Sequence, residues 1–295
     1  MQATHTEQHD GNPDVKTVIW TLGPARIAPY RSYFGCHDDK ETLGAYFWGQ
    51  AIAAALLPCL GMYEVLLRNA VHRSASNFAS RKTSDSFPWY DITETTALTL
   101  RGRTKDKVIE VLYNTNRASP LRHSPQPSPD SVVAALSFGF WPAFLEGLTK
   151  REQPRILTDT FAFHPHSKPG YWSVTEVVTN LIGTLKKIQS LRNAVAHLEP
   201  IWKPHRLKGT ETHWSHSVVS LREIHDEMLR IMTWCCPAAA TAFEHSFGKR
   251  MFRSICSTTA VQAFMADPLA SGEMKLFGAT QSAEAVPALP AEPDK

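Results

Sequence analysis

Arg192, Asn193 and His197 are the side chains of this sequence whose types and spacing best suit chemistry on a phosphate. An arginine can hold phosphate oxygens through two parallel hydrogen bonds, and a histidine exchanges a proton near neutral pH. An asparagine can orient the imidazole or contact a substrate. We therefore interpret the segment as a candidate phosphate-handling site. The alternative is a structural ion pair beside a helix-terminal histidine, whose positive form the helix dipole favours.

These residues stand near the end of the most clearly patterned helix. Ser173 and Glu176 fit a capping box, which predicts a helix start, and Pro200 predicts its end at His197 or Leu198. Residues that recur at helical spacing predict an apolar stripe along this helix: Val174, Val177 or Val178, Leu181, Leu185, Ile188 and Val195.

Arg192 falls on that apolar stripe, so its side chain is expected to point toward the interior. Desolvating an arginine costs on the order of several kcal/mol, so it needs a partner there. Asn193 and His197 are four residues apart and share a face with Gln189. The long stem of Arg192 can curl around the helix end toward them.

A second, similar motif lies upstream. Glu64, Arg68 and His72 are spaced four apart, and Asn69 follows Arg68. Glu64 ahead of Arg68 is the favourable order for a salt bridge within a helix, so that pair can be purely structural. The Arg-Asn dipeptide shared by LLRNAVH and LRNAVAH nevertheless predicts two helices whose polar ends meet at one cleft, with Glu64 as a carboxylate partner for Arg192.

The basic residues after the main motif are candidate RNA contacts. Lys203, Arg206 and Lys208 suit phosphates, and Trp202 suits stacking on a base. The alternatives are a solvated loop for the three cations and the core for Trp202. The net charge of +3, from 31 basic and 28 acidic residues, is too small to indicate a nucleic-acid partner. The segment 101–130, with six basic and three acidic residues, is more suggestive.

Other chemistries find no support in the sequence. It contains no glycine-rich phosphate loop and no GxSxG motif. The histidines at 164, 166, 213 and 216 lack a cysteine or carboxylate at a metal-site spacing. The five cysteines form no CxxC pair, which predicts reduced thiols. No metal and no cofactor is therefore expected.

The pattern of the whole chain predicts an all-α protein. Its 295 residues are 43% hydrophobic, and period-2 runs are few. We expect disordered tails at 1–15 and 279–295, and one helical domain over 16–266 with a proline-rich loop near 118–130. Helices are expected at 39–77 with a kink or a break near Pro58, 95–114, 131–148 with a break at Pro142, 173–198 and 215–235, with shorter ones to 266.

Three blocks of this chain, in order, resemble the Abi-like (abortive infection) proteins of the HEPN superfamily. They are EVLLRNAVH (64–72), ALSFGFWPAFLEG (135–147) and LRNAVAHLEPIW (191–202), and MTWCCPAAATAF (232–243) adds to the likeness. The resemblance covers roughly residues 40–250. Two features depart from the family pattern: Leu198 stands where a second histidine is common, and FAFHPHSK (161–168) matches the middle region only loosely.

The resemblance implies a HEPN-like helical bundle that cleaves RNA without a metal. Arg192 would bind the scissile phosphate, Asn193 would occupy the polar position, and His197 would act as general base or acid. The products would carry a 2′,3′-cyclic phosphate and a 5′-hydroxyl. The family builds its active site across a homodimer, which would complete a single chain's partial acid–base set.

The expected role is a toxin in anti-phage defence or a toxin–antitoxin pair, with an RNA substrate and a protein or small-RNA antitoxin as partners. The first alternative is a non-catalytic RNA-binding or regulatory module. The second is a purely structural dimerisation scaffold, which a sealed, buried Arg192 ion pair would favour. The polar N-terminus and the shortness of the apolar stretch 51–60, which Pro58 breaks, predict a cytoplasmic protein that does not span a membrane.

Overall fold

The computed structural model describes residues 14–91, 93–94, 98–114 and 121–269, and within them the chain is mostly helical. This confirms the all-α prediction. The α-helices are α1 (Val15–Leu22), α2 (Pro24–Phe34), α3 (Asp39–Ala79), α4 (Arg103–Leu112), α5 (Pro129–Ala135), α6 (Phe140–Gly147), α7 (Gln153–Thr160), α8 (Pro169–Trp172), α9 (Thr175–Ala196), α10 (Trp214–Cys235), α11 (Pro237–Glu244), α12 (Phe247–Ile255) and α13 (Thr258–Ala266).

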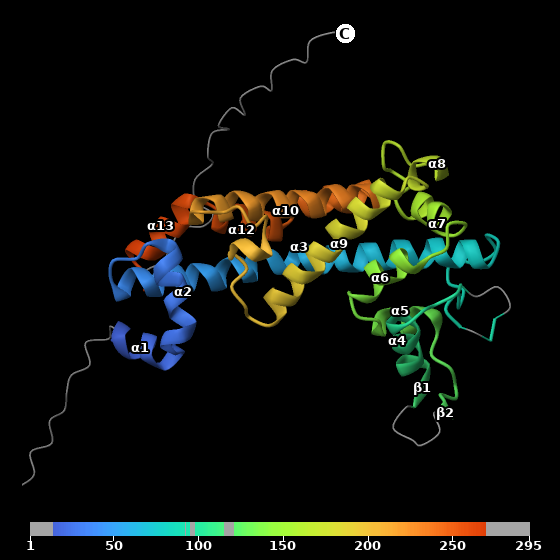
Figure 1. Cartoon of the computed structure of the whole chain (residues 1–295), viewed down its shortest axis with the longest axis horizontal. Coiled ribbons are helices and arrows are strands. Elements are labelled where there is room, and N and C mark those ends of the chain that lie inside the picture. Colours follow the sequence, from blue (N-terminus) through green and yellow to red (C-terminus); the bar gives the residue numbers. More distant parts are fainter. Residues whose placement is uncertain (1–13, 92, 95–97, 115–120, 270–295) are drawn as a thin grey trace, which may run out of the picture.

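The long helix α3 is the axis of the molecule (Figure 1). Its 41 residues make it about 60 Å long, and α2, α7, α10, α12 and α13 all pack against it. Of the two outcomes predicted at Pro58, a kink or the end of a first segment, the second is wrong, because the helix continues through this residue. Pro58 and Ala54 are both exposed, so water can serve the Ala54 carbonyl that a proline four residues later leaves without a donor.

Two close contacts fix the C-terminal helices on α3. A Cβ atom at Gly44 would lie 2.1 Å from the Phe264 carbonyl oxygen of α13, so only a glycine permits this approach. Trp48 is fully buried, and its Nε1 donates a hydrogen bond of 3.0 Å to the Ile255 carbonyl at the end of α12. The buried hydrophobic residues of the described part form one cluster that extends from Ile27 to Phe264.

Several predicted boundaries differ from the structure. The helix expected at 95–114 begins only at Arg103, and residues 95–97 lie outside the described part. The helix expected at 131–148 is interrupted at 136–139 and not at Pro142, which sits in the first turn of α6, where a missing N–H removes no helical bond. The predicted capping box is also wrong. Val174 occupies the cap of α9, and Ser173 Oγ instead donates to the Pro169 carbonyl.

The segments before α3 and around 118–130 contain structure that the sequence pattern did not indicate. The first tail was predicted to reach residue 15, but α1 begins at Val15, and residues 1–13 and 279–295 lie outside the described part. Of the proline-rich loop, residues 123–128 are irregular, as predicted. The adjoining two-residue strands β1 (Tyr113–Asn114) and β2 (Leu121–Arg122) pair antiparallel, with Tyr113 opposite Arg122.

Helix α3 is long and apolar enough, by length and composition, to cross a membrane, with 39% of its most apolar window buried inside the protein. The expectation of no membrane span rested on a short apolar stretch broken by Pro58, and the continuous helix removes that reason. The same features occur in core helices. Helices α2, α7, α10, α12 and α13 pack along α3, and its buried residues include polar ones such as Thr42, Ser74 and Ser76.

Candidate functional site

The candidate site lies where α9 crosses the middle of α3 (Figure 1). The buried face of α9 carries Leu181, Leu185, Ile188, Leu191 and Val195, close to the predicted stripe. Arg192 directly follows the buried Leu191, and this packing directs its side chain toward α3. The helix ends at Ala196, within two residues of the predicted end.

Arg192 forms an ion pair with Glu64, as the sequence indicated. Its Nε donates to Glu64 Oε2 over 3.3 Å, and 39% of the Arg192 side chain is exposed, against 19% for Glu64. The arginine is thus half-buried rather than interior, and the pair is not sealed from solvent. No hydrogen bond from either Nη atom is found among the described residues, so the two Nη groups are left for an incoming anion.

Asn193 and His197 are exposed on the outer side of α9. Their link within the described residues is through the backbone, where the His197 N–H donates to the Asn193 carbonyl at 2.9 Å. The predicted grouping of three side chains is therefore divided. Arg192 turns inward to Glu64 instead of curling around the helix end, while Asn193 and His197 face solvent. Gln189 instead packs against Gly139.

The end of α9 is a Schellman turn built on a residue other than glycine. The Glu199 N–H bonds the Ala194 carbonyl at 2.8 Å, the Leu198 N–H bonds the Val195 carbonyl at 3.1 Å, and Leu198 has φ +55°. Arg26 of α2 donates to the Leu198 carbonyl at 2.9 Å. His197 is thus presented by a turn that is tied to α2.

Replacing Leu198 with glycine is expected to raise the free energy of unfolding by about 1 kcal/mol, because glycine adopts the left-handed conformation without steric cost. Leu198 is 61% exposed, so little apolar contact is lost. Urea unfolding measures the change. Leu198→Ala keeps the unfavourable conformation and should bring no gain; an equal gain in both variants would contradict the argument.

The second motif does not reproduce the first. The salt bridge expected between Glu64 and Arg68 is not found, since Glu64 pairs with Arg192. Arg68 is half-buried, and its Nε has no hydrogen-bond partner among the described residues. Asn69 is half-buried beside it.

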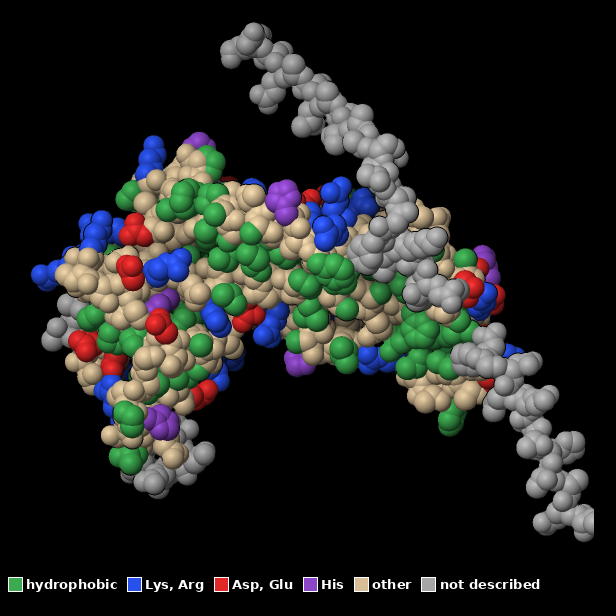
Figure 2. Space-filling model, turned by 180° about the vertical axis from the view of Figure 1, so that it is seen from behind, with side chains coloured by type: hydrophobic (Ala, Val, Ile, Leu, Met, Phe, Trp, Pro, Cys, Tyr) green, Lys and Arg blue, Asp and Glu red, His purple; other side chains and the backbone are tan. Residues whose placement is uncertain are grey.

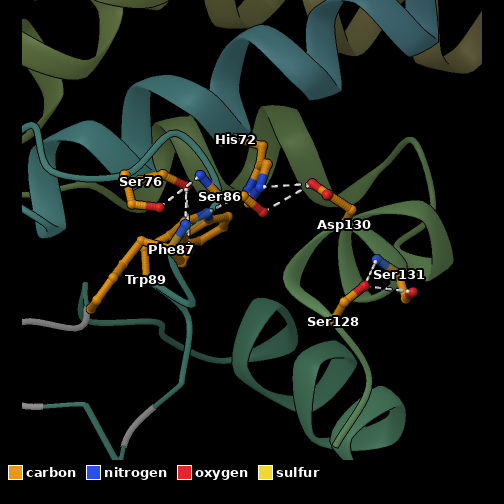
Figure 3. Close-up of polar contacts among 9 residues, drawn as sticks. His72, Ser76, Ser86, Phe87, Trp89, Ser128, Asp130 and Ser131 are labelled. Carbon is orange, nitrogen blue, oxygen red and sulfur yellow. Dashed lines mark hydrogen bonds and ion pairs between the residues drawn. The ribbon is translucent and has the colours of Figure 1, made fainter.

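His72 lies in a buried network of its own (Figure 3). Trp89 Nε1 donates to His72 Nδ1 at 2.9 Å, which places the ring proton of the neutral imidazole on Nε2. That nitrogen faces Asp130 Oδ1 at 3.5 Å, and Ser86 Oγ donates to the same oxygen at 3.1 Å. His72 therefore ties α3 to the following loop and to α5.

The two motifs consequently do not meet at one cleft, which corrects the prediction for His72. The Glu64–Arg192 pair is the part of the two motifs that the structure joins. His72 is eight residues beyond Glu64, about 12 Å farther along α3, and Trp89 covers it. His197 lies at the C-terminal end of α9, in the turn that Arg26 ties to α2.

Two buried histidines make stability depend on pH. Burial lowers the pKa of His72, with a partial opposing effect from Asp130. Burial also lowers the pKa of His225, whose ring stacks on Phe252 at 4.1 Å.

The free energy of unfolding is therefore expected to fall as the pH drops below about 6.5, because the unfolded chain then binds protons that the native histidines do not. Each histidine contributes at most about 1.4 kcal/mol per pH unit in this window. Urea unfolding between pH 7.5 and 5.5 measures the slope. His225→Phe should reduce it, and an unchanged slope would contradict the assignment of that histidine.

The residues after the motif are less available than the sequence suggested. Trp202 is 1% exposed and packs against Tyr30, Tyr33 and Phe34, so it belongs to the core and cannot stack on a base. Arg206 pairs with Glu199, and Lys208 pairs with Glu223. For Lys203, no ion pair is found within the described ranges. Among the described residues, Lys203 is thus the one of the three cations without an ion pair.

Within the described residues, no group of three or more histidine, cysteine, aspartate or glutamate side chains could hold a metal. The ring of His164 packs on Tyr171, Trp172 and Trp234. His213 accepts a hydrogen bond at the start of α10. All five cysteines are free thiols.

A cleft that no sequence pattern indicated lies at the far end of α3. It has a volume of about 690 Å³ and is lined by Asn77, Phe78, Ala79, Arg81, Lys82, Arg151, Glu152, Arg155, Thr158, Asp159 and Pro169. We call it the basic cleft. Its cations come from two segments about seventy residues apart, Arg81 and Lys82 in one and Arg151 and Arg155 in the other. In the sequence, each segment contributes only two of these basic residues, which by themselves do not indicate a site.

Comparisons of the chain with protein-family models, with curated proteins and with solved structures find no match. The molecule is thus defined by its own features: a helical fold around α3, with a half-exposed Arg192–Glu64 pair and an exposed His197 at the end of α9.

Proposed function

We propose that the protein is a metal-independent endoribonuclease in which Arg192 binds the scissile phosphate and His197 transfers a proton. The observation that carries this proposal is the geometry of Arg192. Glu64 holds its Nε and thereby orients the guanidinium, while the Nη groups remain for phosphate oxygens. Asn193, on the same exposed face as His197, is a further substrate contact.

The reaction joins a 2′-hydroxyl oxygen to the adjacent phosphorus and breaks the bond from phosphorus to the 5′ oxygen. One group must take the 2′ proton, and one must deliver a proton to the departing 5′ oxygen. His197 supplies one of these groups. The products are a 2′,3′-cyclic phosphate and a 5′-hydroxyl.

A homodimer supplies the second proton-transfer group in this proposal. Asn193 and His197 are exposed, and no other histidine of the described residues contacts the His197 imidazole. A second copy of the motif facing the first would bring another imidazole to the same phosphate. A protein that is fully active and sediments as a monomer would contradict this arrangement.

The biological role we propose is a toxin of abortive infection or of a toxin–antitoxin pair, acting in the cytoplasm and restrained by a protein or small-RNA antitoxin. It is supported by the order of the three Abi-like, HEPN-like blocks and by the position of two of them. Glu64 comes from the first block and Arg192 from the third, and these residues form the ion pair of the site.

The second candidate function is RNA binding without cleavage. Its support is that a single chain presents one exposed imidazole, His197, without a second proton-transfer group beside it among the described residues. A purely structural role for Arg192 is less well supported, because 39% of its side chain is exposed. Under the binding alternative, Arg192→Ala weakens RNA affinity and His197→Ala leaves it unchanged.

The test of the proposed function is incubation of RNA with the purified protein in EDTA, followed by identification of the product ends. Cleavage that yields 2′,3′-cyclic phosphates and 5′-hydroxyls is the expected result. Binding without any cleavage, across a range of RNA sequences and protein concentrations, would leave the non-catalytic function in its place.

A further inference from the structure

The basic cleft combines four cations with the half-buried side chain of Phe78, which also packs against the core, at the end of α3 where α7 and α8 pack. Arg81, Lys82, Arg151 and Arg155 are exposed, and no ion pair to any of them is found among the described residues. Figure 2 shows Lys and Arg side chains gathered at this end of the molecule, on the left in that view. The cleft is therefore a concave surface with positive charge that its own chain leaves largely unneutralised.

Two carboxylates also line the cleft, but they do not cancel this charge. Glu152 Oε2 accepts a hydrogen bond of 2.8 Å from the Thr149 N–H, so it serves the start of α7. Asp159 is exposed on the same helix. Four cations against two carboxylates leave an excess of two positive charges in a cavity large enough for a nucleotide.

Arg81 and Lys82 adopt a strained backbone conformation that glycine would adopt more easily. The two have φ of +56° and +68°, the left-handed region in which glycine is favoured. They close a Schellman turn on α3, in which the Lys82 N–H bonds the Asn77 carbonyl at 2.7 Å. Cations at two successive positions suited to glycine suggest a role for their charge.

We propose that the basic cleft binds the phosphates of single-stranded RNA, with Phe78 offering its ring to a base. Cations that follow a backbone, together with an aromatic stacking surface, are the usual elements of a single-strand site. The inference rests on the proposed RNA substrate and adds a second contact region. Asn77 is thirteen residues beyond Glu64, so the cleft lies about 20 Å along α3 from the Arg192–Glu64 pair. One strand of several nucleotides spans that separation.

The test measures binding of a fluorescent single-stranded RNA of about 12 nucleotides to the full chain. A His197→Ala background prevents cleavage from disturbing the measurement. The key variant adds Arg81→Gly and Lys82→Gly, which removes two charges and relieves the left-handed strain, so the protein should melt no lower than its parent. Arg250→Gln with Arg253→Gln is the matched control, because this exposed pair on α12 does not line the cleft.

The glycine variant is expected to bind RNA roughly tenfold more weakly at low salt. Its slope of log affinity against log salt should also be shallower by about 1.4, at about 0.7 for each lost contact. The control variant should keep the parental slope. Equal affinity of the glycine and control variants would overturn the proposal, as would displacement of the RNA by a mononucleotide at the same concentration.

Failure of this inference is distinguishable from failure of the proposed nuclease. If the chain with His197 intact cuts RNA, and Arg81→Gly with Lys82→Gly changes neither binding nor cutting in that same chain, the cleft assignment is wrong and the nuclease stands. If RNA binds through the cleft but is never cut, the cleft assignment stands and the nuclease is wrong.

Discussion

His197→Ala is expected to lower the rate of RNA cleavage about 100-fold or more, because it removes a proton-transfer group that contributes about two to four orders of magnitude. The substitution should leave the fold intact. His197 is exposed at the end of α9, and its backbone N–H, which bonds the Asn193 carbonyl, is kept. Single-turnover cleavage rates in EDTA, together with thermal unfolding of each variant, measure both effects.

His245→Ala is the matched control, since this histidine is also exposed just past the end of a helix but lies outside both motifs. It should cleave like the parent protein. Arg192→Ala should lower the rate and weaken RNA binding together, whereas His197→Ala should lower the rate alone. If His197→Ala cleaves as fast as His245→Ala, the assignment of His197 as a catalytic residue is wrong.

Gly44→Ala is expected to destabilise the fold by about 2 kcal/mol or more, the largest effect we expect from adding a single methyl group. The new Cβ would lie 2.1 Å from the Phe264 carbonyl oxygen and 2.6 Å from the Met265 Cα. Both atoms belong to the backbone of α13, so the whole helix must move away from α3. Urea unfolding followed by far-ultraviolet circular dichroism measures the loss.

Gly61→Ala is the control within the same helix. Nothing lies within 4 Å of a Cβ at Gly61, so the change should stabilise α3 by about 0.5–1 kcal/mol through the better helix propensity of alanine. Opposite signs for the two variants would establish that the contact with α13 decides the effect. Equal effects at both positions would contradict the close packing of α13 on Gly44.

Local pattern predicted much of the helical content and one feature of the site. The apolar spacing in 173–198 and 215–235 produced α9 and α10 nearly at their observed ends. The same stripe placed Arg192 toward a carboxylate partner, and Glu64 fills that role. Helix α3 does not end at Pro58. The packing of other helices along it stabilises the helix by more than the loss of the one hydrogen bond that a proline removes.

The sequence could not predict which of the site residues are exposed and which are buried. The sequence made the motif of His72 look similar to that of His197, but Trp89 from a following loop covers His72 and bonds its Nδ1. The sequence allowed Trp202 to stack on a base, but three aromatic side chains of α2 pack around it in the structure. The basic cleft joins two charged segments that are unremarkable when each is read alone.

By itself, then, the sequence determined that Arg192, Asn193 and His197 fall near the end of one amphipathic helix, since helical order depends on residues three and four apart. Only the tertiary structure decided which of their atoms are available. Arg192 Nε is occupied by Glu64, 128 residues away in the chain, while Asn193 and His197 stay exposed. Burial depends on which distant segments pack on a helix, and no local pattern encodes that choice.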